Sequence, residues 1–433
     1  MLTIDIRKFF PAIIALFLMT GTAVSGEPMR LSLENARNYA LDHNRNLINA
    51  GLAIDEAGQR LRETIAQGLP QVNATVDYNN FFGSTASLGA FPGMEITFNP
   101  TSNASLTVGQ ILFNANYLVG VQTARLFRDV TEISRERTEL DIISQVMQAY
   151  YLVLVTEQSR TILKANLGNM RNLLDKTMAL VAAGVADELD YDQLSVQATM
   201  IENGLKAAER QVELSYNMLR LQMGLDATID IALTDDLDYL IERADFQGSL
   251  LAGFRMDENI DYRLMELQTS IAEKQVNFER ATFLPTVTGF YNYTEKLLKP
   301  EFDITPKHVI GFNVNIPIFS SGMRQARVNQ ARINLESVEN QQELLTEQLS
   351  IQERQLRYNL NNALEQYESQ KTNVEVAQRV YRNMRTKFEH GMASSLDLTT
   401  ANNNYLQAEN SYISSLMQLL QAQVEMDKLL NSI

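Results

Sequence analysis

The chain has 433 residues, with 52 acidic against 37 basic side chains and a formal net charge of −15. This acidic balance argues against a nucleic-acid partner, because few cations are available to neutralise phosphates. The sequence contains no cysteine, which excludes disulfides, a thiol nucleophile and a lipid anchor on an N-terminal cysteine.

The first residues have the pattern of an export signal. Arg7 and Lys8 precede an apolar run over residues 9–19, and small residues follow at 23–25. We expect residues 1–25 to be removed on export. The alternative is a membrane anchor, but about eleven apolar residues are fewer than the roughly twenty that a spanning helix needs. No other segment reaches eighteen apolar residues, so entry into a membrane would require β-strands.

Short alternating segments predict β-strands in two pairs. Residues 71–78 place an apolar side chain at every second position, and residues 307–318 do the same. Segments of about ten residues with one apolar face match the strands of transmembrane β-barrels. A soluble, half-buried hairpin gives the same alternation, so the pattern alone leaves both interpretations open.

Two long tracts without proline, 101–284 and 318–433, predict helices, since proline costs about 3 kcal/mol in a helix interior. Between Ala331 and Phe388, apolar residues recur at alternating steps of four and three. This repeat predicts a coiled-coil helix from about 321 to 390, on the order of 100 Å long. A shorter bundle of two or three broken helices is the alternative.

An internal repeat organises the sequence. Residues 44–70 align without gaps on residues 259–285, and further along Gly184 aligns with Gly391. Each half reads as helix, strand pair and long helical hairpin. We therefore divide the chain into a signal (1–25), a first repeat (26–225), an acidic connector of irregular pattern (226–258) and a second repeat (259–433). The strand pairs are expected at about 71–112 and 286–319, and the helical turns near 184 and 391.

The strand count raises a physical problem. Each half supplies two strands, and four strands are too few to close a barrel, whereas an open sheet edge is not tolerated in lipid. The apolar stripe of a helix of such length also exceeds what one hairpin can bury. Assembly of several copies would solve both problems, although the residues alone do not set the number of copies.

At this point the sequence resembles the TolC-like outer-membrane efflux proteins. The resemblance covers nearly all of the chain after the signal, and it rests on the tandem halves and on "LSLENARNYALDHNRNL", "GLPQV", "FLPTV", "IPIFSSGMRQARVNQA" and "KFEHGMASSLDLTTANNNYLQAENSY". It implies a mainly α-helical homotrimer, with a 12-stranded barrel in outer-membrane lipid and a helical tunnel in the periplasm of a Gram-negative bacterium. It also implies an exit duct for tripartite efflux or type I secretion, with a periplasmic adaptor and an inner-membrane transporter as partners.

The resemblance assigns roles to three groups of residues. The strand-to-helix junction would contain Pro317, Ser320, Ser321 and Gly322, with glycine supplying backbone freedom. The hairpin tips would contact the adaptor through Gly184, Gly391 and Phe388. An acidic ring would narrow the periplasmic entrance, formed by Asp190 and Asp397 together with Asp187, Glu188 and Asp192.

Two of these roles have simpler alternatives, and the family pattern is incomplete. The glycines can serve the turns alone, and the acidic residues can complement the start of a helix. A second acidic position of the family reads Thr400 here, and an arginine that latches the family's closed state reads Ala393. The contacts that hold the closed state are therefore expected to differ from those of the family.

The sequence offers no pattern for catalysis. It contains only three histidines, and no metalloprotease, hydrolase, P-loop or dinucleotide-binding motif occurs. We therefore expect no enzyme, no cofactor and no metal site. A soluble periplasmic coiled-coil adaptor remains the alternative function; it would explain the heptads but not the duplicated strand pairs. The cargo is left open.

Overall fold

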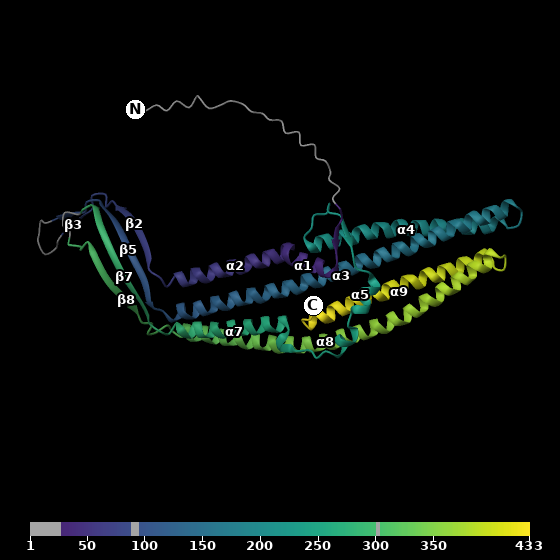
Figure 1. Cartoon of the computed structure of the whole chain (residues 1–433). Coiled ribbons are helices and arrows are strands. Elements are labelled where there is room, and N and C mark those ends of the chain that lie inside the picture. Colours follow the sequence, from purple (N-terminus) through teal and green to yellow (C-terminus); the bar gives the residue numbers. More distant parts are fainter. Residues whose placement is uncertain (1–26, 88–94, 300–303) are drawn as a thin grey trace, which may run out of the picture.

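The computed structural model describes residues 27–87, 95–299 and 304–433. The expected export signal lies outside these residues. Figure 1 shows an elongated molecule with a β-sheet at one end and two helical hairpin tips at the other. None of the described helices has a stretch that is long and apolar enough to cross a bilayer.

A four-stranded antiparallel sheet forms the first end of the molecule, in the order β2 (Gln71–Asn79), β5 (Thr101–Phe113), β7 (Thr286–Leu298) and β8 (His308–Asn315). The halves of the repeat meet at β5 and β7, where Leu106 lies opposite Tyr293. Strands β2 and β8 are therefore the two edges of the sheet.

The sheet differs from the sequence expectation in two places. Strand β8 ends at Asn315, whereas we expected the strand pair to extend to about 319, and Pro317 lacks the N–H that a continued ladder would need. A small hairpin of β3 (Thr85–Ser87) and β4 (Glu95–Thr97) extends the first strand pair. These three-residue strands are too short to show a recognisable alternation in sequence.

Helices make up the rest of each repeat. The first contains α1 (Leu33–His43), α2 (Arg45–Ala66), α3 (Ala115–Ala182) and α4 (Glu188–Met223), and the second contains α7 (Ile260–Ala281), α8 (Met323–Glu389) and α9 (Ser395–Leu429). Helix α8 is continuous over 67 residues, about 100 Å at 1.5 Å per residue. All of its predicted heptad positions are buried or half-buried except Gln352 and Asn359.

The tandem repeat is confirmed at the level of single residues. Helices α2 and α7 each have 22 residues, and each begins after an asparagine cap, Asn44 and Asn259. Both cap side chains accept a hydrogen bond from a backbone N–H in the first turn. The same sequence signal therefore produces the same helix start twice.

The connector is more ordered than its sequence suggests. It contains β6 (Ile231–Leu233), α5 (Leu237–Arg243), α6 (Phe246–Leu251) and a 3-10 turn (Met256–Glu258). Strand β6 pairs in parallel with β1 (Met29–Leu31), which joins the N-terminal segment to the connector. We refer to residues 29–31 and 226–258 together as the belt, which crosses the long helices near their middle (Figure 1).

The belt is fixed to both long helices at equivalent positions, because Tyr150 and Arg357 are related by the same 207-residue offset as the tip glycines. The Tyr150 hydroxyl lies 3.1 Å from both the carbonyl oxygen of Leu31 and Oδ2 of Asp235. The Arg357 guanidinium donates to the carbonyl oxygens of Leu250 and Ala252. The main hydrophobic core surrounds Tyr150, and a smaller one, centred on Met170, lies closer to the tips.

Candidate functional site at the hairpin tips and the strand-to-helix junctions

The two hairpin turns have the same backbone geometry. Gly184 and Gly391 both have φ +72°, the left-handed region that glycine adopts without a Cβ penalty. In each turn the residue after the glycine donates its N–H to a carbonyl five residues back: Val185 to Leu180 at 2.9 Å and Met392 to Lys387 at 2.8 Å. These are Schellman motifs, which satisfy the last carbonyls of α3 and α8.

Each tip exposes a pair of apolar side chains that the sequence reading did not single out. Val185 is 74% exposed and Leu189 61% exposed, and their equivalents Met392 and Leu396 are 69% and 64% exposed. Phe388, which the sequence analysis assigned to adaptor contact, is half-buried against the smaller core. The 207-residue offset could have identified the exposed pairs, since both repeats keep apolar residues at these positions.

The acidic residues differ between the two tips because the helix caps differ. In the first tip Asp187 is itself the cap of α4, and its Oδ1 accepts from the N–H of Leu189 at 3.0 Å. In the second tip the cap of α9 is Ser394, whose hydroxyl lies 2.7 Å from Asp397 Oδ2. Asp397 also accepts from the backbone N–H of Ser394, which completes a capping box.

The capping box has an electrostatic consequence. Hydrogen bonds from the side chain and then the backbone of Ser394 lower the pKa of the Asp397 carboxyl below its ordinary value. The carboxylate remains fully exposed at the helix start. The second tip therefore uses Asp397 in the cap of its own helix.

Asp190, the equivalent of Asp397, has a different partner. Its Oδ1 accepts a hydrogen bond from the hydroxyl of Ser395, which belongs to the other hairpin. Ser395 is only 3% exposed, and its hydroxyl also lies 2.8 Å from Gln193 Oε1. Asp190 therefore links the two hairpins, whereas Asp397 does not.

The remaining residues of the predicted ring lie around this contact. Glu188 and Asp192 are exposed, and neither has a hydrogen-bond or ion-pair partner within the described part of the chain. Ala393 is half-buried. The hydroxyl of Thr400 donates to the carbonyl oxygen of Leu396 at 2.8 Å, so it serves its own helix.

Further polar contacts connect the hairpins. Lys176 Nζ lies 3.1 Å from Glu389 Oε1 near the tips. Deeper in the bundle, the buried side chains of Asn166 and Asn402 are joined by a hydrogen bond of 2.9 Å. With the bond between Asp190 and Ser395, these contacts hold the two hairpins of one chain together over several helical turns.

The two strand-to-helix junctions have different lengths. In the first repeat Asn114 alone separates β5 from α3, and its side chain caps the helix by accepting from the N–H of Tyr117. In the second repeat residues 316–322, which include Pro317 and Ser320, separate β8 from α8. Ser321 and Gly322 both have positive φ there, +49° and +81°. Two consecutive residues of this kind make the sharp change of direction.

Pro317 is followed by two strongly exposed apolar residues. Ile318 is 93% exposed and Phe319 is 85% exposed. They lie where the sheet ends and the helices begin.

Within the described ranges, no group of three or more histidine, aspartate or glutamate side chains is arranged to hold a metal ion.

The sheet has two unpaired edge strands and continues into long paired helices. This arrangement is typical of outer-membrane channel proteins whose helices form a periplasmic tunnel. The family model described as "Outer membrane efflux protein" matches residues 36–225 and 257–432, and the chain belongs to this family. The family consists of channel proteins. The chain is therefore an outer-membrane exit duct of Gram-negative bacteria, with its helices in the periplasm.

Individual relatives are distant in sequence but similar over nearly their full length. The outer membrane protein TolC of Vibrio cholerae is 20% identical over 430 residues, which cover 96% of this chain and 95% of TolC. The proteases secretion protein PrtF of Dickeya chrysanthemi is 23% identical, over 92% of this chain and 87% of PrtF. A crystal structure of CusC has a TM-score of 0.75 at 17% identity, covering 92% of this chain and 91% of CusC.

Proposed function

We propose that three copies of the chain form one duct, which passes substrates from an inner-membrane transporter through the periplasm and the outer membrane. The observation that carries the proposal is the pair of unpaired sheet edges, β2 and β8. An edge strand in lipid leaves backbone groups without hydrogen bonds, at a cost of several kcal/mol each. Pairing β8 of one copy with β2 of the next removes every edge and closes a barrel of twelve strands.

The assembly is tested by measuring mass in detergent. We expect a trimer, and extraction of the protein from membranes should need detergent. A stable monomer or dimer would contradict the proposed duct. Release of the protein by carbonate alone would instead favour the soluble adaptor.

We assign the hairpin tips to contact with a periplasmic adaptor. Two features support this: the conformationally identical turns at Gly184 and Gly391, and the exposed apolar pair beside each of them. Apolar side chains exposed at equivalent positions of both repeats would form a ring of repeated contacts in a trimer. Such a ring suits a partner that assembles in matching copies.

The docking assignment predicts that Met392→Lys abolishes co-purification with the adaptor while the trimer remains intact. The matched control is Leu344→Lys, at a residue on α8 that is 53% exposed and remote from the tips. Residue 391 has a positive φ, which valine avoids. Gly391→Val should therefore distort the turn and also weaken docking. Retained docking in both tip variants would remove the assignment.

We also propose that the tips form the periplasmic gate, with Asp190 as its main carboxylate. The bond from Ser395 to Asp190 joins the two hairpins, and Glu188 and Asp192 lie exposed beside it. Carboxylates in a narrow entrance favour cations. In planar bilayers, Asp190→Asn should lower cation selectivity more than Asp397→Asn does, because it removes a charge and also weakens the bond from Ser395 that joins the two hairpins. Equal conductance and selectivity in both variants and in the wild type would place the gate elsewhere.

We infer that the inner-membrane transporter, and not the hairpin tips, determines which cargo passes through the duct. PrtF is named for secretion of proteases, whereas the family is described by efflux. One fold therefore serves both kinds of cargo. Co-purification with the native transporter would distinguish them for this chain.

A further inference from the structure

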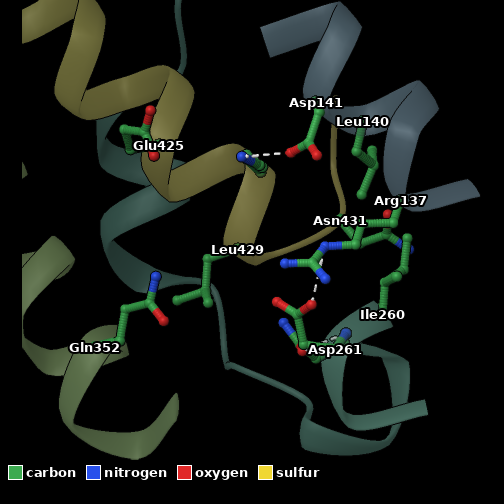
Figure 2. A pocket seen from close by; sticks show the side chains of 11 residues that line it. Arg137, Leu140, Asp141, Ile260, Asp261, Gln352, Glu425, Leu429 and Asn431 are labelled. Carbon is green, nitrogen blue, oxygen red and sulfur yellow. Dashed lines mark hydrogen bonds and ion pairs between the residues drawn. The ribbon is translucent and has the colours of Figure 1, made fainter. Parts of the chain in front are cut away.

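Helices α3 and α9 belong to different repeats and pack against each other. We call the contact between these two helices the seam. Polar pairs join them at two distant points. Lys428 Nζ lies 2.7 Å from Asp141 Oδ1 near the end of α9, where a dashed line marks the pair in Figure 2. Closer to the tips, Asn166 Nδ2 donates to Asn402 Oδ1 at 2.9 Å.

The seam keeps one register between these points. From the first pair to the second, α3 advances 25 residues while α9 runs back 26. A third pair lies between them, in which Gln148 Nε2 donates to Glu425 Oε1 at 2.9 Å. Because both helices rise about 1.5 Å per residue, they run antiparallel without a relative shift over this distance.

The asparagine pair lies inside the smaller hydrophobic core. Asn402 is fully buried and Asn166 is 3% exposed, and Leu167 and Leu398 of the core lie near them in sequence. Each amide uses only one of its two polar groups, since Asn166 Oδ1 and Asn402 Nδ2 are buried without a hydrogen-bond partner. A buried polar group without a partner is unfavourable. The pair is therefore less stabilising than two apolar side chains of similar shape would be.

The next residue of α9 extends this contact to the other helix of the first hairpin. Gln197 of α4 is 5% exposed, and its Nε2 donates to Asn403 Oδ1 at 2.8 Å. Two adjacent residues of α9 therefore bond to α3 and α4 together. We call Asn166, Gln197, Asn402 and Asn403 the polar layer. Because the layer bonds α9 to two helices, it constrains both the axial position and the rotation of α9.

The described part of the chain contains no second layer of this kind. Under the 207-residue offset, Asn166 corresponds to Asn373, which is exposed, and Asn402 corresponds to Ser195. The amide of Asn373 donates to Gln370 on its own helix, at 3.5 Å. The polar layer is therefore a feature of the seam and does not come from the pattern that the two repeats share.

We propose that the polar layer fixes the register of the two hairpins and lowers the stability of the chain in doing so. Apolar core residues alone would accept a shift of α9 by four residues, since leucine would still meet apolar neighbours. With the layer present, this shift places Leu398 or Leu406 against Asn166, whose buried amide then has no partner. A polar residue at a core position of a coiled coil sets the register in this way.

The register matters at the hairpin tips. A shift of the second hairpin by four residues would move Met392 about 6 Å along the helix axis relative to Val185. The exposed apolar pairs of the two tips would then lie at different heights. The polar layer thus keeps the two tips level within one chain.

Cysteine cross-linking tests the register, because the chain has no cysteine of its own. The native reporter is the full-length protein in detergent with Asp190→Cys and Ser395→Cys, at two side chains that are hydrogen-bonded at the tips. This reporter also removes the tip bond, so the test does not depend on that bond. The shifted reporter carries Asp190→Cys and Thr399→Cys. We expect rapid disulfide formation within one chain in the native reporter and far slower formation in the shifted one.

The polar layer is then changed in both reporters. Asn166→Leu with Asn402→Leu should slow the native cross-link at least about fivefold and should speed the shifted cross-link. The matched control changes two exposed asparagines, Asn203→Leu and Asn410→Leu, and should leave both rates unaltered. Gln197→Leu removes the other bond of the layer and should change both rates in the same direction. Unaltered rates in the asparagine-pair variant and in Gln197→Leu would overturn the proposal.

Urea unfolding of the chain with native tips tests the effect on stability. Asn402→Leu alone leaves the amide of Asn166 buried with no partner, so the urea midpoint should fall. Adding Asn166→Leu removes that amide, and the midpoint should rise above that of the wild type. A double variant that is no more stable than the wild type would show that the layer does not lower stability, and this part of the proposal would fail.

Discussion

The first and second repeats share their hairpin turns and the asparagine-capped starts of α2 and α7, yet they attach to the belt by different chemistry. In the first repeat Tyr150 is fully buried, and its hydroxyl joins Leu31 and Asp235 inside the main core. In the second repeat the equivalent Arg357 is 31% exposed and holds two carbonyl oxygens at the surface. A duplicated framework thus preserves the position of an attachment while its energetic basis changes from packing to charge-assisted hydrogen bonds.

The largest effect is expected at the first attachment. Tyr150→Ala removes a fully buried ring and two hydrogen bonds, and it should lower the free energy of unfolding by about 3–5 kcal/mol. Tyr150→Phe keeps the ring and should cost only about 1 kcal/mol. Urea unfolding followed by far-UV circular dichroism measures both changes. Equal effects of the two variants would show that packing does not dominate here.

A smaller effect is expected at Gly224, where the end of α4 packs against the chain just before α2 in the first repeat. Gly224→Ala places a Cβ 2.4 Å from a backbone oxygen at a φ of +75°, and it should cost about 2 kcal/mol. Gly253→Ala, where a Cβ meets no atom within 4 Å, is the matched control and should be nearly neutral. The same unfolding measurement applies. A neutral Gly224→Ala would show that the start of α2 can move away from the end of α4 at little cost.

The second attachment should be weaker than the first. Arg357→Met keeps an apolar stem of similar length but loses the bonds to Leu250 and Ala252, and it should cost about 1–2 kcal/mol. Amide hydrogen exchange should rise in α6 and remain unchanged in α5. Exchange that rises over the whole belt would indicate that the two attachments are not independent.

The smallest effect concerns pH at the two tips. The pKa of Asp397 is lowered in the folded chain, so its stabilising contribution is present above the unfolded pKa and is lost as pH falls through the folded pKa. Amide exchange at the start of α9 should therefore increase below about pH 4 in the wild type. Asp397→Asn should remove this acid dependence, whereas Asp192→Asn should preserve it. An unaltered acid profile in Asp397→Asn would assign the dependence to another group.

The sequence predicted the elements whose signals are long and local. The heptads from Ala331 to Phe388 became α8, and the repeated asparagine caps became α2 and α7. The belt was missed because β1 and β6 have three residues each and pair across about two hundred positions. Such pairs carry no periodicity that a single segment can reveal.

The candidate site shows the limit of reasoning by repeat alignment. The alignment correctly made Asp190 and Asp397 equivalent in position, since both are the third residue of their helices. It could not show that Ser394 would hydrogen-bond to Asp397. Nor could it show that Asp190, which does not bond to the cap residue Asp187, would accept a hydrogen bond from Ser395. The identity of one cap residue decides which carboxylate is available, and this depends on side-chain hydrogen bonding rather than on spacing.

The pairing of Met29 with Ile231 also constrains the order in which the chain can fold. Strand β1 precedes its partner β6 by about two hundred residues, so during export β1 emerges well before β6 does. Closing such a large loop is slow and entropically costly, so the first repeat must wait with its middle incomplete until residue 233 has emerged. The pairing of β1 with β6 therefore makes the final packing of the first half depend on export of the connector.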